Sequence, residues 1–249
     1  MTTAAPAADG GERIAKVIAR AGLCSRRTAE QWIADGRVAV NGRTLTSPAV
    51  VVTETDAVVV DGQPLPPRTT ARLWRYHKPP GLITTHRDPE GRPTVFDRLP
   101  VQLGRVISVG RLDVSSEGLL LLTNDGALAR HLELPGTGWA RRYRVRVFGL
   151  VDEEALEGLQ RGVTVDDVRY GSITARLDRG QGPNSWLTLT LREGRNREVR
   201  KVLEHLGLTV NRLIRISFGP FQLGTLGRGE VAEVPAKVLR EQLGKELAR

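Results

Sequence analysis

The most informative part of the sequence is GRLDVSSEGLLLLTNDG, from Gly110 to Gly126. Asp113 stands in a short polar loop between two apolar runs, Arg105–Val109 and Leu119–Leu122, and Asp125 can cap a short helix through Ala127–Leu132. Apolar runs of this length, bounded by glycines and turn residues, are typical of buried strands. A loop between buried strands gives its side chains little freedom, which suits a catalytic carboxylate. Because aspartate in a polar loop is more often only a turn former, the loop alone leaves both interpretations open.

Length and charge bound the class of protein. The chain of 249 residues has room for one large domain and one small domain. Its 37 Lys and Arg exceed its 28 Asp and Glu, so the net charge is +9 and the pI is near 10.5. This excess favours a polyanionic partner, with nucleic acid as the first candidate. We expect no membrane partner, because no apolar run approaches the roughly 18 residues of a membrane-spanning helix.

The N-terminal residues 1–11 lack the basic and apolar segments of a secretory signal. We expect them to form a disordered tail. The only cysteine, Cys24, excludes an internal disulfide and a zinc site built from several cysteines. We therefore expect a cytoplasmic protein without a metal site. A monomer is the default expectation.

Residues 12–60 carry the pattern of two short helices followed by a hairpin. In Arg13–Ala21 the apolar residues recur on one helical face, and Ser25 can cap a second helix. Asn41-Gly42 is a strong signal for a tight turn between two strands. This order of elements resembles the S4 RNA-binding domain. The resemblance rests on two short sequences, LCSRR at Leu23–Arg27 and GRVAVNG at Gly36–Gly42.

Charge supports RNA binding by this domain. From Arg13 to Arg43 there are seven basic residues against two acidic ones, a net charge of +5. The plainer alternative is a solvated basic face. On the RNA-binding interpretation, the arginines that meet phosphates are Arg26, Arg27, Arg37 and Arg43.

The boundary between the domains is expected at a proline-rich segment. Val50–Val60 has strand character and would close the small domain, and residues 61–71 contain three prolines and read as a linker. Residues 72–249 would then form the second domain. It opens on an expected strand, Leu73–His77, that leads into the turn KPPG at Lys78–Gly81.

Two later segments provide candidate site residues. Arg141–Phe148 alternates, so Tyr143 faces one side with the valines while the arginines face the other. In EGRNREVRKVLEHLG, Glu193–Gly207, we expect Asn196 to cap a helix that places Arg200 at the edge of its apolar face. Taken alone, a tyrosine in such a strand is more often part of a core than a catalyst.

Three stretches resemble the RsuA/RluB branch of ribosomal RNA pseudouridine synthases: GRLDVSSEGLLLLTND at Gly110–Asp125, KPPG at Lys78–Gly81 and EGRNREVRK at Glu193–Lys201. The resemblance covers about residues 12 to 235. The resemblance implies that Asp113 is the catalytic carboxylate, that Tyr143 stacks on uracil and could remove the C5 proton, and that Arg200 pairs with Asp113. It also implies no cofactor. The sequence departs from the family at Arg141, where Lys is common, and at Leu134–Trp139, which lacks a frequent His-Pro.

The resemblance predicts an α+β protein: an S4 domain, then a catalytic domain with a mostly antiparallel mixed sheet and a central cleft. KPPG and GRNREVRK are most similar to the RluB type, which acts on large-subunit (23S) rRNA, so the expected partner is 23S rRNA or a precursor particle. The alternatives are small-subunit (16S) rRNA and a non-catalytic assembly factor. In the second domain we expect RNA contacts from seven residues: Lys78, Arg92, Arg111, Arg141, Arg195, Asn196 and Arg197.

Overall fold

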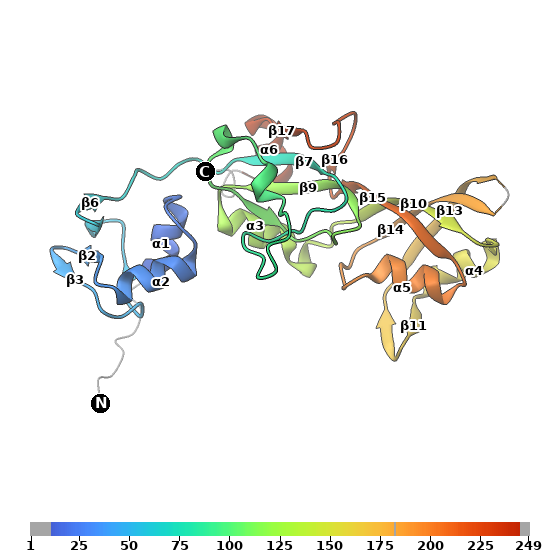
Figure 1. The fold of residues 1–249 in the computed structure, drawn as a ribbon, viewed down its shortest axis with the longest axis horizontal. Coiled ribbons are helices and arrows are strands. Elements are labelled where there is room, and N and C mark those ends of the chain that lie inside the picture. The colour runs from blue at the N-terminus through green and yellow to red at the C-terminus, as the bar shows by residue number, and fades with distance from the viewer. Residues whose placement is uncertain (1–10, 182, 245–249) are drawn as a thin grey trace. The chain divides into compact units, whose positions relative to one another are not determined.

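A computed structural model of the protein describes residues 11–181 and 183–244 (Figure 1). The chain divides into two compact units. The first runs to Thr70 and includes Gly104–Val106, and the second comprises Ala71–Leu103 and the chain from Ile107 onward. Almost all of the tail expected at residues 1–11 lies outside the described residues.

The first unit has the predicted order of two helices and a hairpin. Ser25 caps the second helix by accepting a hydrogen bond from the Thr28 N–H at 3.1 Å. Asn41 and Gly42 both have positive φ, as a tight hairpin turn requires. Ile14, Ile18 and other apolar side chains form the core of this unit. Its elements are α1 (Ile14–Arg20), α2 (Arg26–Ala34), β1 (Glu12–Arg13), β2 (Val38–Val40), β3 (Arg43–Thr44), β4 (Val51–Val52), β5 (Val58–Val60) and β6 (Gln63–Pro64).

Two expectations for this unit need correction. Val50–Val60 is two short strands, because β4 pairs with β1 while β5 pairs with β2 and β6. The linker does not begin at residue 61, since Asp61 and Gly62 form a turn with positive φ and β6 then joins the sheet. The prolines that suggested a linker belong partly to an edge strand, where a missing N–H is tolerated.

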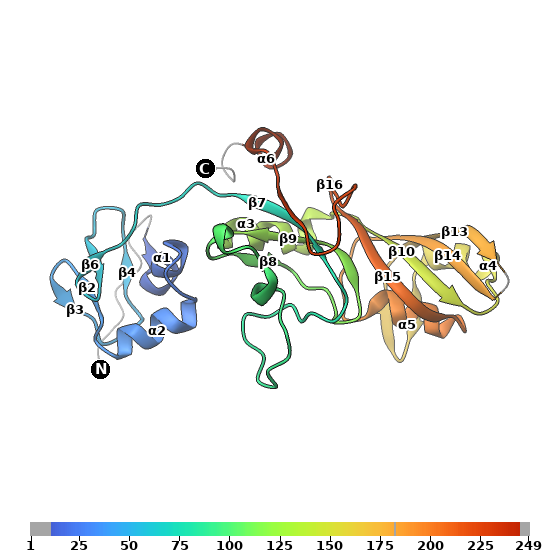
Figure 2. The same cartoon turned by 45° about the horizontal axis from the view of Figure 1, so that its top comes forward.

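The second unit is built on a mixed sheet that, in the described chain, has nine strands (Figure 2). Its main path runs β13-β14-β10-β15-β9-β7-β17, and only the β9–β15 pair is parallel. The predicted mostly antiparallel sheet is therefore confirmed. The strands are β7 (Leu73–Lys78), β8 (Ile107–Val109), β9 (Glu117–Thr123), β10 (Arg141–Phe148), β13 (Ile173–Gln181), β14 (Asn184–Leu191), β15 (Thr209–Phe218), β16 (Phe221–Gln222) and β17 (Val231–Glu233), beside a hairpin of β11 (Val163–Val165) and β12 (Val168–Tyr170).

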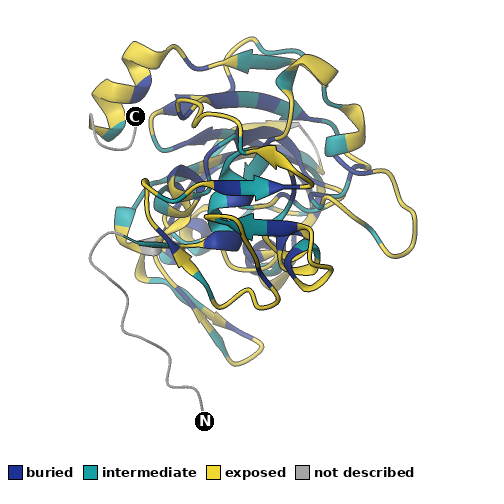
Figure 3. Ribbon diagram, turned by 90° about the vertical axis from the view of Figure 1, so that its left-hand side faces the viewer, coloured by how far each residue is buried: buried dark blue, intermediate teal, exposed yellow. Residues whose placement is uncertain are grey.

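The helices of the second unit pack on this sheet, and buried positions gather on the strands while the loops are exposed (Figure 3). Asp125 caps α3 as predicted, by accepting from the Ala127 and Leu128 N–H groups. Asn196 does not cap α5, because Arg197 occupies the N-cap position with a φ of 51°. The last helix ends at Leu243, and residues 245–249 lie outside the described chain. The helices are α3 (Gly126–Glu133), α4 (Glu153–Gly158), α5 (Glu198–His205) and α6 (Ala236–Leu243), with 3-10 turns at Phe96–Arg98, Val101–Leu103, Pro135–Thr137 and Leu159–Arg161.

Strand β9 is buried at all seven positions and joins the two parts of the sheet. It meets β15 at two register pairs only, Ile214 with Glu117 and Arg215 with Gly118. Gly118 has a φ of 103°, and a Cβ there would lie 2.4 Å from the Arg215 carbonyl oxygen. The approach of these two backbones therefore requires glycine.

Gly118→Ala should reduce the free energy of unfolding by roughly 3 kcal/mol or more, because the added methyl meets backbone atoms and the φ is strained. Urea unfolding followed by tryptophan fluorescence measures this loss. Gly110→Ala is the matched control, since Gly110 also has positive φ but a Cβ there meets nothing within 4 Å. Equal losses in the two variants would show that backbone approach is not what requires Gly118.

Candidate active site

The loop that carries Asp113 has every backbone carbonyl from Leu112 to Ser116 engaged in a hydrogen bond. Thr84 donates its hydroxyl to the Leu112 carbonyl at 2.9 Å, and the Gly81 N–H donates to the Val114 carbonyl at 2.7 Å. The Asp113 carbonyl accepts from the Lys78 ammonium and from the Ser116 N–H. The Ser115 carbonyl accepts from Arg200, and the Ser116 carbonyl accepts from Lys78. Bonds from several elements hold a loop in one conformation, which is how a fold pre-positions a reactive side chain.

Lys78 is fully buried, so the expectation that it contacts RNA is wrong. Its ammonium donates to the carbonyls of Asp113 at 3.1 Å and Ser116 at 2.9 Å, and also to that of Pro79. Burial lowers the pKa of this ammonium to about 8, while the charges of Asp113 and Glu117 oppose the shift. The KPPG turn therefore serves the Asp113 loop from inside the protein.

Arg200 is also buried and reaches the same loop from α5. It donates to the Ser115 carbonyl at 3.3 Å and to the Val210 carbonyl at 3.1 Å. Among the described residues Asp113 forms no ion pair within 4.0 Å, so the expected direct pairing with Arg200 is absent from this structure. Burial lowers the pKa of the Arg200 guanidinium, and the charge of Asp113 opposes that shift. Arg200 thus contacts the backbone of the Asp113 loop rather than the carboxylate itself.

Tyr143 lies in line with the start of β9 across the sheet. It is paired in register with Arg215 of β15, which is paired with Gly118, five residues after Asp113. Two strand spacings place these backbones about 10 Å apart. The Tyr143 side chain is 9% exposed and faces the same side as Val145 and Val147. The register therefore brings Tyr143 to the same part of the sheet as the Asp113 loop.

Sequence reasoning missed Arg215, which lies between these two strands. It is 3% exposed, and its Nε donates to the Leu119 carbonyl at 2.7 Å. Its Nη2 is buried without a hydrogen-bond partner among the described residues. The strand pattern was the available signal: Arg215 falls on the buried parity of β15, two residues after Leu213.

A second buried charge fixes β15 to β9. Glu117 is 2% exposed and forms ion pairs with Arg212 of β15 and, at 2.9 Å, with Arg228. A carboxylate this buried needs such partners, because desolvation of an unpaired charge is costly. The two strands that carry the site are therefore joined by an ionic contact beside their two backbone register pairs.

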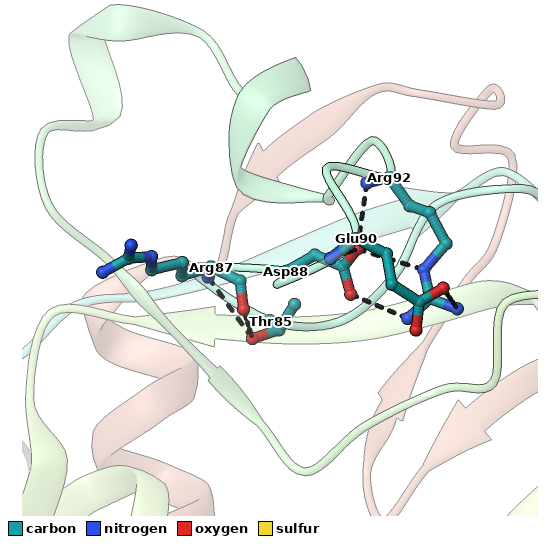
Figure 4. Close-up of polar contacts among 5 residues, drawn as sticks. All are labelled: Thr85, Arg87, Asp88, Glu90 and Arg92. Carbon is teal, nitrogen blue, oxygen red and sulfur yellow. Dashed lines mark hydrogen bonds and ion pairs between the residues drawn. The ribbon is translucent and has the colours of Figure 1, made fainter.

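In the polar loop after Ile83, the side chains of Asp88, Glu90 and Arg92 pair with one another (Figure 4). Asp88 accepts hydrogen bonds from the Arg92 backbone N–H at 2.9 Å and from its guanidinium at 2.8 and 3.0 Å. These bonds lower the pKa of Asp88 to about 2. Glu90 lies 3.0 Å from the same guanidinium. Arg92, expected to contact RNA, is thus already neutralised by two carboxylates.

Both parts of the chain match known protein families. Residues 72–205 match the family described as RNA pseudouridylate synthase, and residues 12–64 match the S4 domain. The chain belongs to the RNA pseudouridylate synthase family. It is a pseudouridine synthase that acts on RNA, and it carries an N-terminal S4 domain.

Relatives cover nearly the whole synthase. An uncharacterized RNA pseudouridine synthase of Rickettsia prowazekii is 45% identical over 93% of this chain and 97% of its own length. A ribosomal large subunit pseudouridine synthase B of Yersinia pestis is 44% identical over 91% of this chain and 74% of its own length. A crystal structure of a pseudouridylate synthase aligns with a TM-score of 0.64 at 26% identity, covering 93% of this chain and 99% of that one.

The other residues expected to contact RNA differ in whether they already have a partner within the protein. Arg37 is bound to Asp61 and Arg195 to Glu193, while Arg141 donates to the Arg192 carbonyl at 2.7 Å. These three charges already have partners within the protein. The remaining six are exposed and stay predicted RNA contacts: Arg26, Arg27, Arg43, Arg111, Asn196 and Arg197.

The described chain contains no group of three or more His, Cys, Asp or Glu side chains placed to hold a metal ion. No helix within residues 11–181 and 183–244 is both long enough and apolar enough to span a bilayer.

Glu198, at the start of α5, is a buried carboxyl that sequence reasoning did not single out. It is 3% exposed, accepts a hydrogen bond from the Arg195 N–H at 3.0 Å, and leaves Oε1 buried without a partner in the described structure. Burial, with a smaller contribution from the charge of Glu193, raises its pKa from 4.5 to about 7. It lies two residues before Arg200, in the first turn of the helix that contacts the Asp113 loop.

This shift predicts a pH dependence of stability. Between pH 4.5 and about 7 the folded protein holds a proton that the unfolded chain releases. The contribution is therefore complete below pH 4.5 and is lost as the pH rises through about 7, by at most about 1.4 kcal/mol per pH unit. Glu198→Gln should flatten this decline in urea unfolding between pH 5 and 7.5. Glu204→Gln, an exposed position on the same helix, should leave it unchanged; a Glu198→Gln curve parallel to wild type would contradict the assignment.

Proposed function

We propose that this synthase converts a specific uridine of large-subunit (23S) rRNA to pseudouridine, with Asp113 as the catalytic residue. The observation that carries the proposal is the Asp113 loop, whose five consecutive carbonyls are held by donors from β7, the KPPG turn, Thr84 and α5. A fold that engages so many groups to hold one loop favours a function for the side chain on it.

The reaction fits a single held carboxylate. Pseudouridine formation breaks the bond from uracil N1 to ribose C1′, turns the base, and forms a bond from C5 to C1′. The hydrogen on C5 leaves as a proton and N1 regains one, so no electrons are gained or lost. Asp113 either attacks C1′ or removes the proton from C2′ to give a glycal. Deuterium at C2′ distinguishes the two routes, since only the second breaks that bond.

Tyr143 and Arg200 support Asp113 in this proposal. Tyr143 stacks on the uracil and serves as the base for the C5 proton, from a strand whose register aligns it with the Asp113 loop. Arg200 holds the Asp113 loop through the Ser115 carbonyl, without a direct ion pair to the carboxylate. The target uridine must leave its helix to reach these groups, so the enzyme flips it out of the stack.

The choice of RNA rests on two observations. Relatives from Yersinia pestis and Pseudomonas aeruginosa, at 44% and 45% identity, are named ribosomal large subunit pseudouridine synthase B. The S4 domain presents Arg26, Arg27 and Arg43 at its surface, where they can meet phosphates. This supports rRNA as the partner and the cytoplasm as the compartment.

Incubation of the protein with transcripts of each rRNA, followed by nucleoside analysis, tests the proposal. Pseudouridine in large-subunit rRNA alone is the expected result. Pseudouridine only in small-subunit rRNA would show that the proposed substrate is wrong and the proposed reaction is right. Modification of neither RNA, naked or as an assembly intermediate, would overturn the proposed function.

A further inference from the structure

The outer face of β10 carries a row of three exposed arginines: Arg142, Arg144 and Arg146. Because side chains alternate along a strand, the Cα atoms of these arginines repeat about every 6.8 Å along one face. Tyr143 and Val145 point to the opposite, buried face. That face is covered by α4 and α5, which lie on one side of this part of the sheet (Figure 1). The arginine row therefore lies outside the proposed active site.

The charges of the row are unusually free. Within the described chain, none of its three arginines has a carboxylate within 4.0 Å. Neighbouring arginines on the same face are neutralised: Arg212 pairs with Glu117, and Arg176 pairs with Asp178 at 3.0 Å. The fold thus supplies partners to the flanking positive charges and leaves the row unpaired, although three unpaired like charges repel one another.

An aromatic ring completes this surface. Trp186 of β14 is paired in register with Arg146 and is partly exposed. The Arg144 guanidinium lies over its ring at 4.7 Å from the centroid, and Arg212 lies at 5.9 Å. Thr190 extends the same face with a hydroxyl group, whereas Thr188 donates its hydroxyl to Asp178 at 2.6 Å. Arginine, threonine and an aromatic ring on an open sheet are the groups that contact nucleic-acid backbones and bases.

We propose that this face, defined by Arg142, Arg144, Arg146 and Trp186, binds the phosphate backbone of a second segment of the RNA substrate. The inference rests on the proposed function in taking rRNA as the substrate. A folded rRNA is large enough to reach both faces of the sheet, one segment presenting the uridine and another lying on the row. A linear polyanion matches a linear row of charges, whereas an acidic protein surface has no such repeat.

The test compares salt dependence on two RNAs. The triple variant Arg142→Gln/Arg144→Gln/Arg146→Gln removes the row at exposed positions where the fold does not need it. Each lost phosphate contact lowers the slope of log K against log salt by about 0.7 to 0.9. On a transcript of a whole large-subunit rRNA domain, the slope should therefore fall by about 2 to 3. On the shortest hairpin that the enzyme still modifies, which cannot reach both faces, the slope should not change.

A charge-matched control removes three positive charges elsewhere on the same unit: Arg130→Gln/Lys237→Gln/Arg240→Gln, all exposed. It should retain the wild-type slope on the long transcript. Equal slopes for the row variant and wild type would overturn the proposal, as would equal losses in the row and control variants. Loss of binding to anionic phospholipid vesicles, with RNA slopes unchanged, would assign the face to a membrane instead. Because binding to the long transcript needs no turnover, this result is independent of whether Asp113 proves catalytic.

Discussion

Asp113→Asn should remove pseudouridine formation while leaving RNA affinity within about twofold of wild type. The amide keeps the shape of the carboxylate but can neither attack C1′ nor accept the C2′ proton. A loss of at least 10⁴-fold in single-turnover rate is expected, as for removal of a nucleophile in other enzymes. The five carbonyl bonds that hold the loop use backbone atoms of residues 112–116, so the substitution leaves them intact.

Nucleoside analysis after a single turnover measures the rate, and fluorescence anisotropy with labelled RNA measures the affinity. Asp97→Asn, a carboxylate that accepts from Thr94 away from the Asp113 loop, is the control and should retain turnover. If Asp113→Asn weakened RNA binding as strongly as it slowed the reaction, the residue would be a binding group rather than the catalyst.

Lys78→Met has the second-largest expected effect. It removes the ammonium that donates to the carbonyls of Asp113 and Ser116 and leaves the latter without its donor. Stability changes by the difference of two opposing effects, because a lost buried hydrogen bond costs about 1–3 kcal/mol while a buried charge no longer needs desolvation. For the reaction rate, no second effect opposes the loss of these hydrogen bonds. A loop displaced by about 1 Å can cost 10²-fold in rate, so kcat should fall at least that far.

Steady-state kinetics on rRNA, with circular dichroism to check folding, measures this effect. The mechanism predicts a fall in kcat with little change in KM, since Lys78 is buried and cannot touch RNA. Lys237→Met, at a side chain 80% exposed, should behave as wild type. A rise in KM with unchanged kcat would indicate instead that Lys78 contacts RNA.

Local sequence patterns predicted most of the fold, because each of them depends only on residues that are close together in the sequence. Caps at Ser25 and Asp125, the Asn41-Gly42 turn and the alternation of β10 all depend on neighbouring residues, and each is confirmed. The Asn196 cap was wrong because Arg197 takes the left-handed conformation and Glu198 begins the helix. The linker was placed too early, since Asp61-Gly62 is equally typical of a hairpin turn.

The site was harder to predict, because its connections are long-range. A lysine in a turn looks like a phosphate contact until the fold buries it against a loop 35 residues away. The isolated positive charge of Arg215 and the β9–β15 pair depend on strands about a hundred residues apart, which no local pattern encodes. Whether Arg200 touches Asp113 or its loop is likewise a matter of tertiary geometry.

Tritium release from large-subunit rRNA labelled at uridine C5 reports the reaction itself, because C5 loses its hydrogen only when the base is rejoined through that carbon. Wild-type protein and Asp113→Asn are compared at equal concentration with the same RNA. If Asp113 is the catalyst, wild type releases one tritium per RNA and the variant releases none. Release by Asp113→Asn at the wild-type rate would contradict this role, because the carboxylate held by this loop would then not be the catalyst.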